Sequence, residues 1–282
     1  MNIFNIAGVN LKIMSKEACF FHELNYFTSS DAKDYDLKIK ISKSQGVTLS
    51  EGEKILNERI SWVRSNKKDI LFQAFICKEE SKKVLAVLEI NDSWTEAEIT
   101  YCEDKDYSID ATVNLLLEIF FRNYILQKDG IVIHAAAIDW KGKGIAFTAP
   151  SGGGKSTQAM LWKKYMGAKI LNDDRPTIRR RDDKFSIYGT PWSGSSLEFI
   201  NDSAPLSAIF IIQQSKVNVL EKLNKHQAVV QLTPRCFLPY FDSGLMDLAL
   251  LQLEKVINEI PVYLLKCTPE KEAVELVYEC VK

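Results

Sequence analysis

The sequence predicts an α/β protein with mixed sheets, in which a smaller, mostly β domain of α+β type precedes a larger α/β domain. Three observations predict this class. Short strand patterns dominate residues 1–107, a strand, a glycine-rich loop and a helix follow one another at Ile145–Tyr165, and strands and helices then continue to the C-terminus. We therefore place the N-terminal domain at 1–107 and the second domain at 108–282, with a connecting helix at 108–129.

The composition excludes several classes of protein. Of the 282 residues, 46% are hydrophobic, which is ample for a packed core, and 36 basic residues nearly balance 37 acidic ones. This balance argues against nucleic-acid and membrane-surface partners, which need a basic face. No apolar run approaches the roughly 18 residues of a membrane helix, and the N-terminus lacks the basic and apolar regions of a signal peptide. The six cysteines lack C-x-x-C spacing, so we expect free thiols in a soluble, cytoplasmic protein.

The N-terminal domain is predicted to consist mainly of strands. Alternating or apolar patterns predict strands at Ile3–Met14, Leu37–Ile41, Leu71–Cys77, Val84–Ile90 and Glu96–Tyr101, the third and fourth joined as a hairpin. Ser50–Val63 predicts a helix, because Glu51 and Glu53 lie near its start and apolar residues recur further along it. No chemical motif occurs in this domain, and we expect its charged side chains to be solvated.

A long helix is predicted at Ser108–Gln127, where the two domains join. Ser108 and Asp110 can cap its start, and Gly130 is well placed to end it. Ile131–Ile138 then predicts a strand. The short DWKGKG turn that follows predicts an antiparallel hairpin with the next strand, Ile145–Thr148.

The glycine-rich loop between Ile145–Thr148 and a helix opening at Lys155 carries the strongest chemical signal. Gly152, Gly153 and Gly154 permit positive φ and close approach of a ligand to the backbone. Successive amide groups at the start of a helix suit phosphate oxygens. The pattern is that of a P-loop, with Ala149 where the strict motif has glycine. The residues expected to contact a nucleotide are Ser151, Gly152, Gly153, Gly154, Lys155, Ser156 and Thr157. The alternative is a glycine-rich turn that only links a strand to a helix.

The remaining elements complete a sheet with helices and a substantial antiparallel component. Strands are predicted at Lys169–Asn172, Thr177–Arg180, Phe185–Tyr188, Ala208–Gln213, Val217–Leu223 and Val262–Cys267. Helices are predicted at Gln227–Leu232, Gly244–Ile260 and Pro269–Val281. The sequence GTPWSGSS, Gly189–Ser196, is predicted to be a loop.

Two acidic residues and one histidine are candidates for chemistry beside this loop. Asp173 and Asp174 follow the strand reached directly from the loop helix, and a βαβ unit would bring that strand end beside the loop. One carboxylate could hold a metal ion and the other could accept a proton from an attacking hydroxyl. The alternative is an acidic turn capped by Arg175. His134 is predicted in mid-strand among alanines, where a structural role and a site role are equally compatible with the pattern.

These residues carry a family resemblance. His134 with three alanines, then APSGGGKST, then Gly167-Ala168 and NDD, resemble in this order the catalytic domain of HPr kinase/phosphorylase. The resemblance spans Gly130–Trp192, and the wider superfamily includes the phosphoenolpyruvate carboxykinases, so it implies a phosphoenolpyruvate-carboxykinase-like P-loop fold. It further implies a kinase that uses ATP and Mg²⁺ to phosphorylate a hydroxyl, often that of serine.

The resemblance also implies roles for individual residues. Lys155 would hold the phosphates, and Ser156 and Asp173 would hold Mg²⁺. Asp174 would be the catalytic base, and His134 would lie close to the transferred phosphate. The catalytic candidates are therefore Asp174, His134 and Lys155, and the metal-binding candidates are Ser156 and Asp173.

Departures from the family pattern limit what is carried over. Thr157 stands where HPr kinases usually have Glu, and a further metal-binding Glu is not recognisable near GTPWSGSS. The family's C-terminal motif with its arginine is not found either, and Arg235 is the candidate to replace that arginine. The expected substrate is therefore not HPr. Because GTPWSG is typical of diverged HPr-kinase-like proteins, some found beside peptide-modifying enzymes, we expect a hydroxyl-bearing peptide, protein or small molecule. Trp192 fits a packed core better than a substrate pocket.

Three other functions fit the same motifs. A carboxykinase-like enzyme would need extra metal and arginine sites, which this chain has little room to provide. A non-catalytic ATP-binding regulator would bind nucleotide without turnover, and a simple NTPase would release phosphate without an acceptor. A homo-oligomer is compatible with each of these functions.

Overall fold

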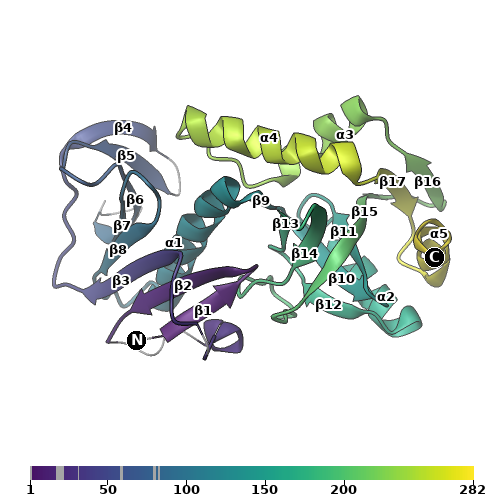
Figure 1. The fold of residues 1–282 in the computed structure, drawn as a ribbon, viewed down its shortest axis with the longest axis horizontal. Coiled ribbons are helices and arrows are strands. Elements are labelled where there is room, and N and C mark those ends of the chain that lie inside the picture. Colours follow the sequence, from purple (N-terminus) through teal and green to yellow (C-terminus); the bar gives the residue numbers. More distant parts are fainter. Residues whose placement is uncertain (1, 17–21, 31, 58–59, 79–80, 82) are drawn as a thin grey trace. The chain divides into compact units, whose positions relative to one another are not determined.

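The structure, a computed structural model, describes residues 2–16, 22–30, 32–57, 60–78, 81 and 83–282 (Figure 1). The chain divides into two compact units, Met1–Tyr124 and Ile125–Lys282. None of the described helices has the length and apolar character needed to cross a membrane. Over its described residues, the protein is of mixed α/β type, with one sheet in each unit.

The first unit is built on an eight-stranded sheet, counted over its described residues, with the order β1-β2-β3-β8-β7-β6-β5-β4. The β2–β3 and β3–β8 pairs are parallel, and the other pairs are antiparallel. Helix α1 packs against β7 and β8. The elements are β1 (Asn2–Ile6), β2 (Val9–Met14), the 3-10 helix η2 (Leu24–Phe27), β3 (Leu37–Lys43), β4 (Gly52–Asn57), β5 (Ser61–Ser65), β6 (Phe72–Cys77), β7 (Val84–Ile90), β8 (Glu96–Tyr101) and α1 (Ile109–Tyr124).

Most strand predictions for this unit are confirmed, with two corrections. The segment Ile3–Met14 is a hairpin of β1 and β2, because Ala7 and Gly8 both take positive φ and turn the chain. The helix predicted at Ser50–Val63 is wrong, since this stretch contains β4 and the start of β5. The apolar spacing there is helical, but β5 is buried and pairs with β6, and this tertiary pairing outweighs local periodicity.

The connecting helix ends earlier than predicted. Helix α1 stops at Tyr124, and a 3-10 turn, η3 (Ile125–Lys128), follows it. Asp129, with φ of 54°, takes the left-handed position expected for Gly130. Gly130 instead opens β9 (Gly130–Val132), where an added Cβ would lie 2.7 Å from the side chain of Ile125. Helix α1 belongs to the first compact unit, whereas the sequence places 108–129 with the second domain.

The second unit is built on a nine-stranded mixed sheet, again counted over the described residues. Its main path is β12-β10-β11-β15-β14-β13-β9, and β17 pairs with both β15 and β16. The strands are β9, β10 (Ala135–Trp140), β11 (Lys143–Thr148), β12 (Lys169–Asn172), β13 (Thr177–Arg181), β14 (Lys184–Tyr188), β15 (Ser203–Gln214), β16 (Val219–Lys222) and β17 (Val262–Cys267). The helices are α2 (Lys155–Met166), α3 (Lys225–Leu232), the 3-10 helix η4 (Thr233–Arg235), α4 (Ser243–Glu259) and α5 (Lys271–Val281).

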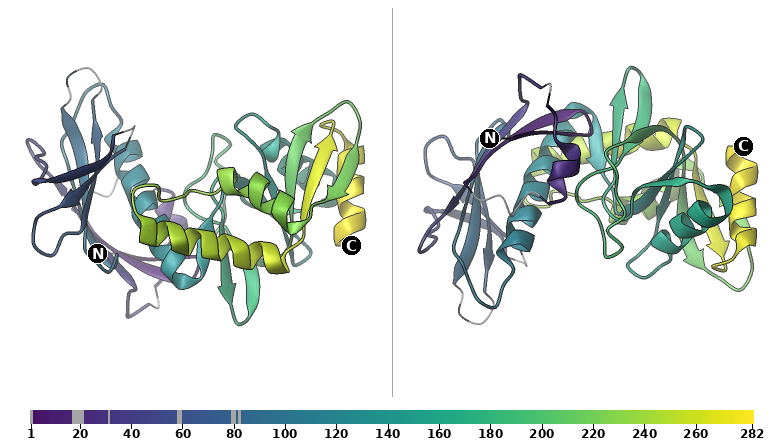
Figure 2. Two further views of the ribbon diagram at one scale, coloured as in Figure 1. Left: turned by 90° about the horizontal axis from the view of Figure 1, so that it is seen from above. Right: turned by 90° about the horizontal axis from the view of Figure 1, so that it is seen from below.

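The core of this unit lies between the sheet and helices α2 and α5, which lie side by side (Figure 2). Trp162 of α2 is fully buried against Phe147 of β11, and Phe210 of β15 is fully buried beside Phe147. Fully burying an aromatic side chain of this size contributes roughly 1.5–3 kcal/mol or more. The packing therefore fixes α2, and with it the loop that precedes α2, on the sheet.

His134 is not in the middle of a strand, which corrects the strand predicted at Ile131–Ile138. Strand β9 pairs with β13, whereas β10 pairs with β11 and β12, so the chain changes neighbours between Val132 and Ala135. The His134 amide donates to the carbonyl of Arg235 at 2.7 Å, which holds the chain at this crossing point. The sequence predicts one continuous strand here, but the segment forms two strands because β9 and β10 pair with different neighbours.

The topology gathers three chain segments at one edge of the sheet. Strand β10 is antiparallel to both β11 and β12, with Ala135 opposite Thr148 and Ala137 opposite Asn172. The hairpin of β10 and β11 is therefore confirmed. The βαβ prediction needs one correction, because β10 lies between the two parallel strands β11 and β12. The start of β10 and the ends of β11 and β12 consequently meet at the same edge.

Candidate functional site

The glycine-rich loop, Ala149–Gly154, joins the end of β11 to the start of α2, as predicted. Gly152 and Gly154 have φ of 73° and 105°, which other residues rarely adopt. A Cβ at Gly153 would lie only 2.7 Å from the Cβ of Ala149, and the Gly153 amide donates to the carbonyl of Pro150 at 2.9 Å. Glycine is therefore favoured at 152 and 154 by the backbone conformation and at 153 by close packing. Ala149 is buried beneath the turn.

The start of α2 is open to an anionic ligand. Gly154 is the N-cap and supplies no side-chain cap, so no side chain of the N-cap residue satisfies the first helical amides. Ser151, Ser156 and Thr157 are exposed there. The helix dipole favours negative charge at this end.

Lys155, at the end of the loop, interacts electrostatically with the acidic pair. Its side chain is buried, and burial lowers the pKa of Lys155 below its ordinary value. The negative charges of Asp174 and Asp173 oppose this shift, whereas the positive charge of Arg235 adds to it. Lys155 therefore lies within electrostatic reach of both aspartates and of Arg235, and an anionic ligand would relieve its loss of solvation.

Asn172 positions the acidic pair, and sequence analysis did not select it. Its side chain is fully buried and donates to the carbonyls of Thr190 and Trp192 at 2.9 and 3.2 Å. Its side-chain oxygen accepts from the backbone amides of Asp174 and Arg175 at 2.9 and 2.6 Å. A polar residue at the end of a buried strand was the available signal, because such a residue must find internal partners.

Asp174 and His134 are brought together. The Nε2 atom of His134 lies 3.0 Å from one carboxylate oxygen of Asp174, and Nε of Arg175 lies 3.3 Å from the other. Burial by itself raises the pKa of Asp174. The hydrogen bond from His134, and then the positive charges of Arg175 and Lys155, outweigh burial and hold this pKa below its ordinary value. Asp174 is therefore an ionised carboxylate held between the imidazole of His134 and the guanidinium of Arg175.

Asp173 contacts the loop Gly189–Ser196 instead. It is buried, one carboxylate oxygen accepts from the Gly194 amide at 2.6 Å, and the other accepts from the hydroxyl of Ser196. A Cβ at Gly194 would lie 3.2 Å from Asp173 and 3.3 Å from Asp174, so this loop packs closely on the pair. Trp192 is buried, as the core interpretation predicts.

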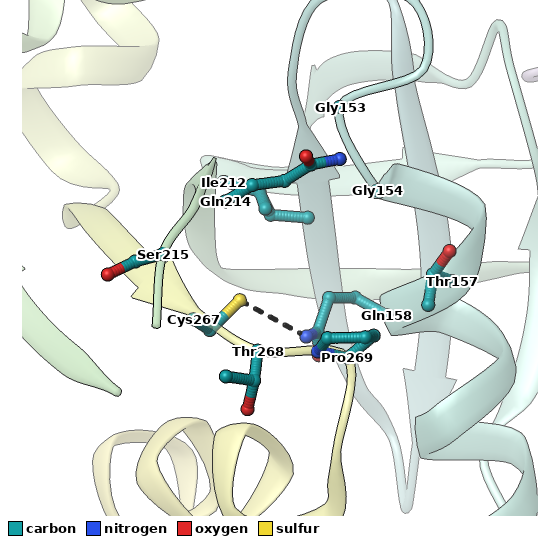
Figure 3. A pocket seen from close by; sticks show the side chains of 10 residues that line it. All are labelled: Gly153, Gly154, Thr157, Gln158, Ile212, Gln214, Ser215, Cys267, Thr268 and Pro269. Atoms are coloured by element: carbon teal, nitrogen blue, oxygen red, sulfur yellow. Dashed lines mark hydrogen bonds between the residues drawn. The ribbon is translucent and has the colours of Figure 1, made fainter. Parts of the chain in front are cut away.

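A pocket of about 380 Å³ lies on the other side of the glycine-rich loop (Figure 3). It is lined by Gly153, Gly154, Thr157, Gln158, Ile212, Gln214, Ser215, Cys267, Thr268 and Pro269. The side-chain amide of Gln214 donates to the Gly152 carbonyl at 3.1 Å, and that of Gln158 donates to the Cys267 sulfur at 3.4 Å. Sequence analysis missed this pocket. No sequence signal was available for it, because the pocket forms where strands β15 and β17, both parallel to β11, end at the same edge of the sheet.

The metal-binding potential of the site rests on oxygen atoms. Among the residues that the structure describes, no group of three or more His, Cys, Asp and Glu side chains forms a metal cluster. Mg²⁺ in nucleotide sites, however, usually takes one or two carboxylates together with phosphate oxygens and water. Ser156, Asp173 and Asp174 offer this kind of donor.

The five described cysteines are free thiols, as predicted, and Cys19 lies outside the described residues.

Comparison with known proteins gives a family for the chain. Among solved structures, the Hpr(Ser) kinase/phosphatase from Coxiella burnetii is similar with 9% sequence identity and a TM-score of 0.32, covering 52% of this chain and 93% of that chain. A similarity this low carries no argument about function, and no curated protein matches. The family model of the SynChlorMet cassette protein ScmC matches residues 97–275, more than half of the chain. The chain therefore belongs to the SynChlorMet cassette protein ScmC family.

Proposed function

We propose that this protein is a kinase that transfers the γ-phosphoryl group of ATP to a hydroxyl group of a peptide, a protein or a small molecule. One observation carries the proposal. The glycine-rich loop with Lys155 lies at the same sheet edge as His134 and the two aspartates, and Lys155 is within electrostatic reach of both aspartates. Phosphoryl transfer is catalysed mainly by such positioned charges.

The triphosphate is assigned to the glycine-rich loop. The positive φ angles of Gly152 and Gly154 turn the loop backbone, and the helix start that follows has no side-chain cap. Amides in this setting bind phosphate oxygens, and Lys155 adds a buried positive charge. The loop is, in this proposal, a P-loop.

The nucleoside is assigned to the pocket beyond the loop. Ile212, Cys267 and Pro269 give it apolar surface, and Gln214 and Thr268 give it hydrogen-bonding groups. Small-molecule sites combine apolar surface with a few polar groups in this way. The pocket touches Gly153 and Gly154, so a ligand could occupy the pocket and the loop at once.

The residues present fit a magnesium ion. Ser156 and Asp173 would hold it, which follows the family resemblance, and Asp174 is a further carboxylate nearby. When bound, the ion would neutralise charge on the phosphate oxygens. The protein needs to supply no further ligands to the ion, because phosphate oxygens and water complete the usual Mg²⁺ coordination shell.

Asp174 is proposed to accept the proton of the attacking hydroxyl. It is ionised and is held in place by His134 and Arg175, so its orientation is fixed before substrate arrives. The low pKa makes it a modest base, and the positioning of the hydroxyl supplies most of its effect. His134, whose Nε2 faces Asp174, lies where it can orient this carboxylate.

The test combines binding with transfer. Titration calorimetry with ATP and Mg²⁺ should detect binding to the full chain, and Lys155→Ala should weaken it by about 10- to 100-fold, because a hydrogen bond to a charged group contributes roughly 1.5–3 kcal/mol. Lys164→Ala, on the exposed face of α2, is the matched control and should bind as the unaltered chain does. Absence of binding to any nucleoside triphosphate would overturn the proposal. Binding with no transfer to any hydroxyl would favour a regulator, and phosphate release to water alone would favour an NTPase.

A further inference from the structure

The loop that follows β14 covers Asp173, the carboxylate that the proposed function assigns to Mg²⁺. Only 4% of Asp173 is exposed. One of its carboxylate oxygens accepts a hydrogen bond from the Gly194 amide at 2.6 Å, and the other accepts one from the hydroxyl of Ser196. Both oxygens are therefore engaged by the chain itself, in a position that solvent barely reaches.

This arrangement leaves little room for a metal ion beside Asp173. Mg²⁺ takes oxygen ligands at about 2.0–2.1 Å in a near-octahedral shell and usually keeps several water molecules. The ion, its waters and the phosphate oxygens need open space next to the carboxylate. Gly194 fills that space, since a Cβ added to it would lie 3.2 Å from a carboxylate oxygen of Asp173. The loop must therefore withdraw before Asp173 can hold the ion.

The covering segment is short and is anchored on both sides. Before it, the Trp192 carbonyl accepts a hydrogen bond from the side-chain amide of the buried Asn172 at 3.2 Å. After it, Glu198 forms an ion pair with Lys163 of α2 at 2.7 Å. The residues between these anchors, 193–197, include both partners of Asp173. A movement confined to this segment would therefore uncover the carboxylate.

Leu197 shows that the covering position is unfavourable for the backbone. Its φ is 51°, in the left-handed region that residues other than glycine, asparagine and aspartate rarely adopt. Its side chain is 65% exposed, so its burial offsets little of this cost. Backbone strain of this kind occurs in segments that switch between two positions. The hydrogen bonds from Gly194 and Ser196 to Asp173 oppose the strain and hold the segment closed.

We propose that residues 193–197 form an inhibitory lid, which closes over Asp173 and opens when Mg²⁺ binds with the nucleotide. This inference rests on the proposed function, which assigns Asp173 to the ion. The ion and the lid compete for the same carboxylate. The apparent affinity for Mg²⁺ is therefore the affinity of the open form multiplied by the fraction of molecules whose lid is open. A weaker lid should bind the ion more tightly.

Hydrogen exchange of the full chain, read by mass spectrometry, measures the opening without reference to activity. ATP with Mg²⁺ should increase exchange in 193–197, because the Gly194 amide then loses its carboxylate partner. The same addition should decrease exchange in the glycine-rich loop, at 151–157. ATP with EDTA should leave 193–197 unchanged. Unchanged or decreased exchange of 193–197 with Mg²⁺ would overturn the proposal.

Ser196→Ala should tighten binding of the metal, whereas loss of a group that helps to hold the metal would weaken it. Calorimetry measures the ratio of the ATP affinity with Mg²⁺ to the ATP affinity with EDTA. We expect this ratio to rise roughly 10-fold, because a hydrogen bond to a charged group shifts an equilibrium by at least about this factor. Ser196→Thr keeps the hydroxyl and should restore the ratio. Ser195→Ala, at the neighbouring exposed serine, is the matched control. A ratio that Ser196→Ala leaves unchanged or lowers would contradict the lid.

Failure of the lid and failure of the proposed function give different results. If the chain binds ATP and transfers phosphate while 193–197 exchange equally with and without Mg²⁺, the lid is wrong and the kinase assignment stands. If calorimetry detects no binding of any nucleoside triphosphate, the proposed function fails and the inference fails with it.

Discussion

The two sides of the glycine-rich loop differ in the kind of groups they present. On the side of β10 and β12 lie His134, Asp173, Asp174 and Arg175, which form ion pairs and charge-assisted hydrogen bonds. On the side of β15 and β17 lies a pocket whose polar groups are amides and hydroxyls, next to apolar side chains. The loop separates a charged region from a neutral one.

This difference indicates a division of labour. Charged groups stabilise charge that moves during a reaction, whereas a neutral, partly apolar pocket binds a ligand without changing it. Substitutions on the charged side should therefore change the rate of transfer more than nucleotide affinity. Substitutions on the pocket side should change affinity more than rate. Four predictions test this division, in order of decreasing effect.

The largest effect is expected from Asp174→Asn on the charged side. Loss of the carboxylate should lower the rate of phosphoryl transfer by about 10²- to 10⁴-fold, because it removes a general base, and should leave the Kd for ATP nearly unchanged. Radiolabel transfer and calorimetry measure the two quantities. Asp182→Asn, in the exposed turn between β13 and β14, is the control. Equal losses in ATP affinity and transfer rate would contradict the proposed division of roles between the charged side and the pocket side.

Asn172→Ala should destabilise the charged side. It removes four hydrogen bonds that the buried amide makes with the backbone of Asp174, Arg175, Thr190 and Trp192. We expect the free energy of unfolding to fall by about 2–4 kcal/mol, since buried groups left without partners cost roughly 1–3 kcal/mol each and part of this cost is relieved by relaxation. Urea denaturation measures the change, with the exposed Asn201→Ala as control. A loss below about 0.5 kcal/mol would show that Asn172 does not organise this segment.

Gln214→Ala should act on the pocket side. It removes the hydrogen bond to the Gly152 carbonyl and one polar group of the pocket. One neutral hydrogen bond contributes roughly 0.5–1.5 kcal/mol, so the Kd for ATP should rise about 2- to 10-fold, with the transfer rate at saturation little changed. Gln213→Ala, its neighbour on β15, is the control. A fall in saturated rate with constant affinity would contradict the assignment.

Cys267 offers the mildest test, through its pH dependence. Burial raises the pKa of the Cys267 thiol above its ordinary value, and the hydrogen bond from Gln158 opposes this only in part. Because only the thiolate reacts, alkylation of Cys267 should be slow at neutral pH and should still increase above pH 9. ATP with Mg²⁺ should slow it further by covering the pocket, whereas the exposed Cys280 should react equally with and without ATP. Mass spectrometry separates the two sites, and equal reactivity of Cys267 with and without ATP would place the nucleoside elsewhere.

The sequence predicted best where chemistry and local structure depend on neighbouring residues. The order of β11, the glycine-rich loop and α2 follows from an apolar run, three glycines and a helix start within one short stretch. Strand β12 and helix α2 also have nearly their predicted bounds, because Gly167 takes the left-handed conformation that ends a helix. The contact of His134 with Asp174 was not predicted, because it depends on the pairing of β10 with β12.

What escaped prediction depends on contacts between distant segments. The pocket brings together 153–158, 212–215 and 267–269, and no local pattern specifies that β15 and β17 end beside the loop. The contact of Asp173 with Ser196 joins residues on different sides of a hairpin. The Ser50–Val63 helix failed for the same reason, since pairing of β5 with β6 cannot be inferred from periodicity in one segment.

The hydrogen bond from Gln214 to Gly152 has an electrostatic consequence for the loop. A carbonyl oxygen carries partial negative charge, and one that faced a bound anion would repel it. An amide donor on the Gly152 oxygen, together with the Gly153 amide on the Pro150 oxygen, offsets part of that charge at two of the loop's peptide groups. Gln214 of strand β15 thus makes the electrostatic potential inside the turn more positive. A carboxylate side chain at position 214 would make this potential more negative.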